Sequence, residues 1–159
     1  MNFLRTKPID ISEIVAIEAN LENSKFITPN TTEEHLRLLK DDDIMHLVIK
    51  SESSDILGFI ILAGLTNNHK SIEFRRIVIR DKGKGLGRKA VRYIKTYAFE
   101  TLQCNRLWLD VLKKNTRAKS LYLSEGFKEE GVLREALLTQ EGFQDLVLMS
   151  ILKKDFNND

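Results

Sequence analysis

The chain has 159 residues, of which 42% are hydrophobic and 30% are charged, and its formal net charge is +2. This length and hydrophobic content predict one domain with its own core, because no proline- or serine-rich linker divides the sequence. Since positive and negative charges nearly cancel, the composition argues against general electrostatic binding to nucleic acid, and any anion site has to be local.

Cysteine usage and the apolar runs limit the setting in which the chain works. The single cysteine, Cys104, has no partner for a disulfide within the chain, and no apolar leader run opens the sequence. The longest apolar run, residues 56–65, contains two glycines and is too short to span a bilayer. We therefore expect a cytoplasmic protein without a membrane partner, in which Cys104 is a small buried side chain rather than a nucleophile.

Hydrophobic periodicity predicts a helical opening followed by strands in the first half of the chain. Thr31 and Glu34 have the spacing of a capping box, which indicates the start of a short helix. Polar turn residues separate the strand-forming runs after it, so we expect an antiparallel meander. The expected elements are a strand over 2–5, a helix from about 10 to 22, a short helix after Thr31, and strands over 44–50, 56–65 and 71–80.

In the second half, strands and helices alternate before a closing hairpin. Apolar residues at helical spacing predict a helix over 86–102. The strand-forming run over 106–112 can pair in parallel with the strand before that helix through a right-handed crossover. Asn115 is a good N-cap for a further helix, which Gly126 is placed to stop. The hairpin strands are expected over 127–138 and 143–152.

The most informative motif is a glycine-rich run that joins the meander to the long helix. It reads Lys82-Gly83-Lys84-Gly85-Leu86-Gly87-Arg88 and places three of the chain's eight glycines within five positions. Without a Cβ, this backbone can turn sharply and point successive N–H groups at one anion, beside the positive end of the following helix. The run therefore indicates a pyrophosphate site; the alternative is a plain turn whose glycines only relieve backbone strain.

The spacing of the run excludes two familiar phosphate sites. It lacks the Gly-Lys-Ser/Thr ending of a P-loop, so a nucleoside triphosphatase is not expected. It also lacks the Gly-x-Gly-x-x-Gly order, and the acidic residue about 20 positions later, that a dinucleotide site requires.

Two motifs together resemble those of the GNAT N-acetyltransferase superfamily. The glycine run is similar to the family's Gln/Arg-x-x-Gly-x-Gly/Ala coenzyme A loop, with Lys82 in place of the usual Gln or Arg. The segment from Asn115 to Tyr122, followed by Gly126-Phe127, is similar to the family's Asn-x-x-Ala-x-x-x-Tyr-x-x-x-Gly-Phe pattern. The resemblance is strong over about 72–151 and looser before it; the loop preceding Lys82 is about one residue shorter than usual and lacks the common proline.

The resemblance implies a GNAT-like α/β fold, with a mixed, mostly antiparallel central sheet of about seven strands flanked by about four helices. It implies a single acetyltransferase domain over 1–159, with an acceptor-side N-terminal part over 1–70 and an acetyl-CoA-binding core with the closing hairpin over 71–152. The residues around Glu73, and those from Phe127 to Glu135, look like the branch that includes spermidine acetyltransferases and ribosomal-protein N-terminal acetyltransferases.

The same resemblance implies acetyl-CoA as the cosubstrate and no metal. The main chain at one strand end would pair with pantetheine, and one of its N–H groups would polarise the thioester carbonyl. Asn115 would contact the cofactor as well as cap its helix. The residues expected to bind acetyl-CoA are Ile77, Val78 and Ile79 for pantetheine, Lys82, Gly83, Lys84, Gly85, Leu86, Gly87 and Arg88 for the pyrophosphate, and Asn115.

Acetyl transfer from a thioester to an amine requires a base for the amine and an acid for the departing thiolate, because a lysine-type amine has a pKa of about 10.4. The resemblance implies that Tyr122 is the acid beside the coenzyme sulfur; the alternative is a core tyrosine that anchors its helix. Glu73 would be the base, acting through water; the alternative is a solvent-facing glutamate on a strand.

The expected function is transfer of an acetyl group from acetyl-CoA to a primary amine by direct attack in a ternary complex. A polyamine or a protein N-terminus is the expected acceptor. Acidic residues in the N-terminal half could attract a cationic amine, or they form a solvated face. These residues are Glu33, Glu34, Asp41, Asp42 and Asp43.

Two other functions stay open. The first alternative is a non-catalytic acyl-CoA-binding or regulatory module that keeps the phosphate loop. The second, a nucleic-acid-binding domain, has less support because its basic residues would also suit a helix beside cofactor phosphates; they are Lys113, Lys114, Arg117 and Lys119. No nucleic acid partner is expected, and a homodimer through exposed sheet edges is possible.

Overall fold

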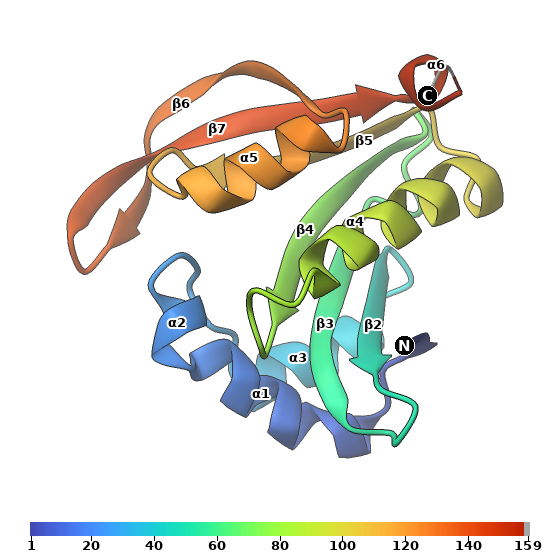
Figure 1. Ribbon diagram of the computed structural model, residues 1–159, viewed down its shortest axis with the longest axis vertical. Coiled ribbons are helices and arrows are strands. Elements are labelled where there is room, and N and C mark those ends of the chain that lie inside the picture. Colours follow the sequence, from blue (N-terminus) through green and yellow to red (C-terminus); the bar gives the residue numbers. More distant parts are fainter. Residues whose placement is uncertain (158–159) are drawn as a thin grey trace. The chain divides into compact units, whose positions relative to one another are not determined.

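The computed structural model describes residues 1–157, so Asn158 and Asp159 lie outside the described part (Figure 1). The chain divides into two units: unit 1 comprises residues 1–67 and 74–87, and unit 2 comprises residues 68–73 and the described chain from Arg88 on. In chain order the elements are β1 (Asn2–Arg5), a 3₁₀ turn (Pro8–Asp10), α1 (Ile11–Ala19), α2 (Leu21–Ser24), α3 (Thr32–Leu39), β2 (Ile44–Lys50), β3 (Ile56–Ala63), β4 (Ser71–Ile79), α4 (Leu86–Thr96), a π-helical turn (Tyr97–Thr101), β5 (Arg106–Leu112), α5 (Thr116–Ser124), β6 (Lys128–Thr139), β7 (Gly142–Leu152) and α6 (Lys153–Phe156).

Within residues 1–157, seven strands are hydrogen bonded in the order β1-β2-β3-β4-β5-β7-β6, which confirms the expected mixed sheet. Unit 1 contains the antiparallel ladder β1-β2-β3, in which Ile44 lies opposite Ala63. In unit 2 the first residues of β4 pair in parallel with β5, Ser71 opposite Arg106, and β7 pairs antiparallel with β5 and β6. The parallel pairing expected from the crossover connection is therefore confirmed.

Local capping signals explain where α2 and α3 begin. The capping box is confirmed, because Thr31 Oγ1 accepts the Glu34 N–H at 3.2 Å and Glu34 Oε2 accepts the Thr31 N–H at 2.7 Å. The helix expected over 10–22 is wrong at its end: Asn20 interrupts it and caps α2 by accepting the Glu22 N–H at 3.0 Å. With α2 and α6, each four residues long, the described part has six α-helices where about four were expected.

The long helix of unit 2 has the apolar face that its spacing predicts. Ala90, Val91, Ile94 and Ala98 are all fully buried. The helical path continues to residue 101 but widens at its end, where a π-helical turn follows α4. Among residues 1–157, no helix is long and apolar enough to cross a membrane.

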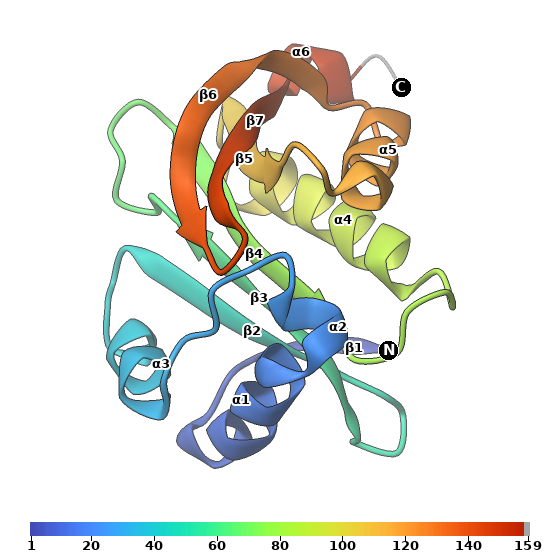
Figure 2. The same ribbon diagram turned by 90° about the vertical axis from the view of Figure 1, so that its left-hand side faces the viewer.

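The core of unit 1 lies between the sheet and two helices. Side chains of α1 and α3 pack on β2 and β3, and Figure 2 shows both helices against these two strands. Because Val78 of β4 belongs to the same cluster, the core fixes the strand that leads to the glycine run. The cluster consists of Ile11, Ile14, Ile17, Ile44, Val48, Ile56, Phe59, Ile61, Ala63 and Val78.

A chain of polar side chains runs through this core. Glu18 is fully buried, and its carboxylate lies 3.2 Å from His35 Nε2 and 3.2 Å from an Arg76 guanidinium nitrogen. His35 Nδ1 lies 3.0 Å from His46 Nε2, and His46 Nδ1 lies 2.9 Å from Thr6 Oγ1. These contacts are consistent with the Thr6 hydroxyl donating to His46, His46 donating to His35, and His35 donating to Glu18. This set of donors requires an uncharged His46.

A second close contact holds β4 against β3. Gly58 has no Cβ, and an ideal Cβ built there would lie 2.2 Å from the carbonyl oxygen of Val78 and 3.1 Å from Cα of Ile79. Only glycine permits this approach, because both neighbours are backbone atoms that cannot rotate away. One residue further, the Arg80 N–H donates to the Leu57 carbonyl at 2.8 Å.

The polar chain predicts acid-sensitive folding. Burial, and then the nearby His35, lower the pKa of His46 from 6.5 to about 4. The unfolded ring is protonated below about pH 6.5 and the folded ring only below about pH 4, so the unfolded state binds more protons in this window. The free energy of unfolding should therefore fall on acidification across it, by about 3 kcal/mol from this residue.

Urea denaturation at pH 7 and pH 4.5 measures this loss. We expect His46→Gln to reduce the difference between the two pH values, because glutamine does not titrate. Equal differences in wild type and His46→Gln would contradict the prediction.

The glycine contact makes a second prediction about stability. Gly58→Ala should lower the free energy of unfolding by about 2 to 3 kcal/mol, because a backbone carbonyl must move to admit the methyl group. Gly131→Ala is the control, since a Cβ there would meet no atom within 4 Å and should change stability little. Thermal unfolding measures the stability of the two variants. A Gly58→Ala protein as stable as the control would refute the prediction.

Candidate active site

The glycine run forms an open turn between β4 and α4. Gly83 has a φ of +86° and Gly85 a φ of +72°, in the left-handed region that favours glycine. Neither N–H donates to a backbone acceptor among the described residues, and the first turn of α4 adds donors without partners inside the helix. A Cβ at either glycine would meet nothing within 4 Å. The backbone therefore fits a diphosphate, which can approach unpaired N–H groups without steric hindrance.

The basic side chains of this turn have different surroundings. Lys82 Nζ donates to the backbone carbonyl of Glu22 in α2 and lies 5.7 Å from the centre of the Phe26 ring. Lys84 is exposed, and its Nζ lies 3.6 Å from Asp81. The structure thus holds Lys82 against α2, whereas Lys84 stays at the surface of the turn.

The strand end expected to bind pantetheine is held by its side chains. Val78 and Ile79 are buried and Ile77 is half-buried. Because these side chains serve packing, only the main chain of the three residues is suited to a ligand. Earlier in β4, Glu73 is half-buried and lies opposite Trp108 of β5.

In unit 2, α5 presents two of the expected site residues. Asn115 Oδ1 accepts the Ala118 N–H at 3.2 Å, so its expected capping role is confirmed. Gly126 has a φ of +91° just after the end of α5, as its expected stopping role requires. Tyr122 is 8% exposed, and its ring centre lies 5.6 Å from that of Phe127.

The environment of Tyr122 keeps its phenol in the neutral form. Burial raises the pKa of Tyr122, and the negative charge of Asp110 raises it further. The phenol therefore holds its proton throughout the physiological range and can donate a hydrogen bond. It has the chemistry of a proton donor and not of a nucleophile.

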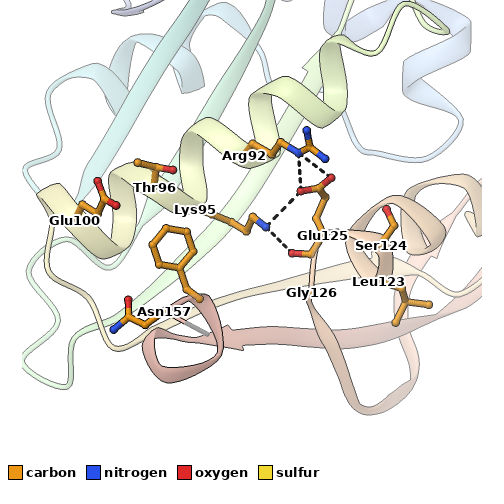
Figure 3. Close-up of a pocket in the computed structure, with 10 residues that line it drawn as sticks. Arg92, Lys95, Thr96, Glu100, Leu123, Ser124, Glu125, Gly126 and Asn157 are labelled. Atoms are coloured by element: carbon orange, nitrogen blue, oxygen red, sulfur yellow. Dashed lines mark hydrogen bonds and ion pairs between the residues drawn. The ribbon is translucent and has the colours of Figure 1, made fainter. Parts of the chain in front are cut away.

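Arg88, the last residue of the glycine run, takes part in a cluster that the sequence did not predict. Arg88 donates to Glu125 Oε1 at 2.5 Å and to Ser124 Oγ at 2.9 Å. Arg92 and Lys95 bind the same carboxylate, as Figure 3 shows. Arg88, Arg92 and Lys95 have the spacing of one helix face, and this basic stripe is the signal from which an acidic partner could have been expected.

Other side chains singled out from the sequence have structural partners. Cys104 is buried, and burial raises the pKa of its thiol to about 11, which suits a packing role rather than a nucleophile. Asp43 accepts hydrogen bonds from the Gly64 N–H at 3.1 Å and from the Thr66 N–H at 2.9 Å. Within residues 1–157, no group of three or more His, Cys, Asp or Glu side chains could hold a metal ion.

The basic residues near α5 are largely paired with acids. Lys119 lies 3.2 Å from Glu129, Lys113 lies 4.0 Å from Asp145, and Lys114 pairs with Glu141. A surface that binds nucleic acid uses unneutralised cations along the backbone of its ligand. This pairing reduces the positive charge on which the nucleic-acid alternative depends.

Comparisons with known proteins agree with these motifs. The model of the acetyltransferase (GNAT) domain family matches residues 4–128. YdaF of Bacillus subtilis strain 168, which has the provisional name of a ribosomal N-acetyltransferase, is 30% identical over 105 residues, 65% of this chain and 57% of YdaF. Spermidine N(1)-acetyltransferase of Escherichia coli strain K12 is 28% identical over 100 residues, 62% of this chain and 54% of that enzyme.

A solved structure extends the similarity to the whole fold. The crystal structure of spermidine N-acetyltransferase from Vibrio cholerae in complex with CoA and spermine has a TM-score of 0.89 and 25% identity, over 99% of this chain and 98% of that one. The chain spans little more than half the length of the two sequence relatives. Because the family match covers most of its residues, the chain belongs to the GNAT acetyltransferase domain family.

Proposed function

We propose that this protein is an N-acetyltransferase that moves an acetyl group from acetyl-CoA to a primary amine by direct attack in a ternary complex. The observation that carries the proposal is the open turn before α4, where two glycines with positive φ leave backbone N–H groups without backbone partners. Membership of the GNAT family supports acetyl-CoA as the ligand of this turn.

The proposed binding roles follow from the surroundings of each residue. The N–H groups of Gly83, Lys84, Gly85, Leu86 and Gly87 would hold the diphosphate, with the exposed Lys84 adding charge. The backbone of Ile77, Val78 and Ile79 would pair with pantetheine, and Asn115 would contact the ligand from the start of α5. Lys82 and Arg88 would contribute through their main chain and their positive field, since their side chains already have partners in the protein.

Bound acetyl-CoA supplies the acetyl group as a thioester. We assign Glu73 to take a proton from the amine, through water, as the nitrogen bonds to the acetyl carbon. Tyr122 gives its proton to the sulfur as the carbon–sulfur bond breaks, so a thiol leaves instead of a thiolate. The raised pKa of Tyr122 keeps the phenol protonated at physiological pH, so it has a proton to give.

The proposed acceptor is a polyamine or a protein N-terminus, as the names of the spermidine and ribosomal relatives suggest. The acidic residues of the N-terminal half give limited help, because Glu34 belongs to a capping box and Asp43 binds a neighbouring turn. Glu33 and Asp42 are exposed and remain available to a cationic amine.

A homodimer remains a prediction. Large apolar side chains are exposed on the β6–β7 hairpin, and β6 is the last strand in the sheet order. Such side chains on an edge strand support association of two copies. They are Val132, Leu133, Leu138 and Phe143.

The proposed function is tested first by calorimetry with acetyl-CoA and then by an acetyl-CoA consumption screen. The screen compares polyamines, amino sugars, amino acids and N-terminal peptides. Binding together with turnover on a polyamine or a peptide supports the enzyme. Binding without turnover on any amine favours the acyl-CoA-binding module, and absence of binding by the folded protein contradicts both.

Removal of the Tyr122 hydroxyl should separate chemistry from binding. We expect Tyr122→Phe to lower kcat by about 100-fold, the usual size of a general acid's contribution, and to leave the Kd for acetyl-CoA nearly unchanged. Phenylalanine has the same ring as tyrosine, so the contact with Phe127 is kept. Unchanged turnover would leave Tyr122 with only a packing role.

Glu73 is tested by removing its charge. If Glu73 is the base, Glu73→Gln should lower kcat by about tenfold or more and leave the Kd for acetyl-CoA nearly unchanged. Glutamine keeps the length and shape of glutamate, so the substitution removes the charge with little change of volume at this half-buried position. A variant with wild-type kcat would exclude Glu73 as the base.

A further inference from the structure

One buried carboxylate in unit 2 binds three cations. The Glu125 side chain is 4% exposed, and its oxygens accept hydrogen bonds from Arg92 Nε at 3.0 and 3.1 Å and from Arg88 at 2.5 Å. Lys95 Nζ lies 3.3 Å from the same carboxylate and also donates to the backbone carbonyl of Glu125 at 2.6 Å (Figure 3). Both polar ends of this one residue are therefore bound by side chains of α4.

The three cations come from successive turns of one helix. Positions 88, 92 and 95 lie on a single face of α4, beginning in the turn that directly continues the glycine run. Glu125, which binds these cations, lies immediately after α5 and three residues beyond Tyr122. Its carboxylate therefore joins α4, along most of its length, to the end of the helix that carries the proposed proton donor.

This contact fixes a geometry more narrowly than apolar packing would. Burial raises the pKa of the Glu125 carboxyl, but hydrogen bonds from Arg92, Arg88 and Lys95 outweigh burial and leave it below the ordinary value. Breaking a buried ion pair is strongly destabilising, and hydrogen bonds from charged donors are geometrically specific, so these donors restrict how α4 and the residue after α5 can move.

We propose that Glu125 is a positioning residue for acetyl transfer: by holding α4 and the end of α5 together, it places the Tyr122 hydroxyl for proton donation. The inference rests on the proposed function. Glu125 would touch neither acetyl-CoA nor the amine and would act only by positioning Tyr122. It also orients Arg88 by binding one of its terminal nitrogens.

The first experiment compares Glu125→Gln with Glu100→Gln. Glutamine keeps the shape of glutamate but cannot hold three cations as a charged acceptor. We expect kcat of Glu125→Gln to fall at least tenfold while the Kd for acetyl-CoA, measured by calorimetry on protein shown to be folded by circular dichroism, changes less than threefold. Glu100 and Glu125 line the same surface pocket, which Figure 3 shows. Because Glu100 is exposed, Glu100→Gln should retain wild-type kcat and Kd.

A double-mutant cycle with Tyr122→Phe then separates positioning from a general structural effect. If Glu125 acts through Tyr122, its substitution should cost little further kcat once the hydroxyl is absent. If the substitution disturbs the site by a general structural effect that does not act through Tyr122, the two losses should multiply. Should Glu125→Gln not fold, Arg92→Gln removes one exposed cation from the cluster and should show a smaller loss with the same non-additivity.

The outcomes distinguish failure of the acetyltransferase function from failure of the positioning role of Glu125. A wild-type protein that transfers acetyl to no amine overturns the proposed function, and the positioning role with it. An active wild type combined with a Glu125→Gln variant of wild-type kcat, or with multiplicative losses in the cycle, overturns the positioning role and leaves the acetyltransferase proposal standing.

Discussion

The bend between β4 and α4 is the constraint on which the rest of this protein depends. Gly83 and Gly85 adopt positive φ, and their N–H groups have no backbone acceptor in the described chain. Such exposed donors can bind water or an anion, which is the basis of the diphosphate role proposed for this turn. The core keeps the approach to this bend rigid, because Val78 belongs to the hydrophobic cluster and Gly58 admits its carbonyl at close range.

Each unit also contains a buried carboxylate that is held by several polar partners. Glu18 in unit 1 is bound by Arg76 and by His35. His35 is hydrogen bonded in turn to His46, and His46 to Thr6. Glu125 in unit 2 is bound by cations along one face of α4. In both cases burial raises the carboxyl pKa and the hydrogen-bonding partners lower it by more. A buried charge is tolerated only where its partners are fixed, so these two groups restrict how helices can lie within each unit.

Much of the fold could be predicted from the sequence because its signals are local. The strands over 44–50 and 106–112 have the predicted limits, since polar turns bound both runs. Thr31 and Asn115 cap helices where the spacing indicated. The break at Asn20 was missed because the apolar pattern continues across it, although asparagine is itself a capping residue. The π-helical turn after α4 has no comparable local signal.

The sequence by itself determined the residues that need a particular backbone conformation. The glycine run, the Asn115 cap and the stop at Gly126 belong to this class, because steric limits on φ and the capping hydrogen bond act within a few residues. Only the tertiary structure decided the partners of the charged side chains. Arg88 meets a glutamate 37 positions away and Thr6 a histidine 40 positions away. Such pairings depend on distances that packing alone sets, and no local pattern encodes them.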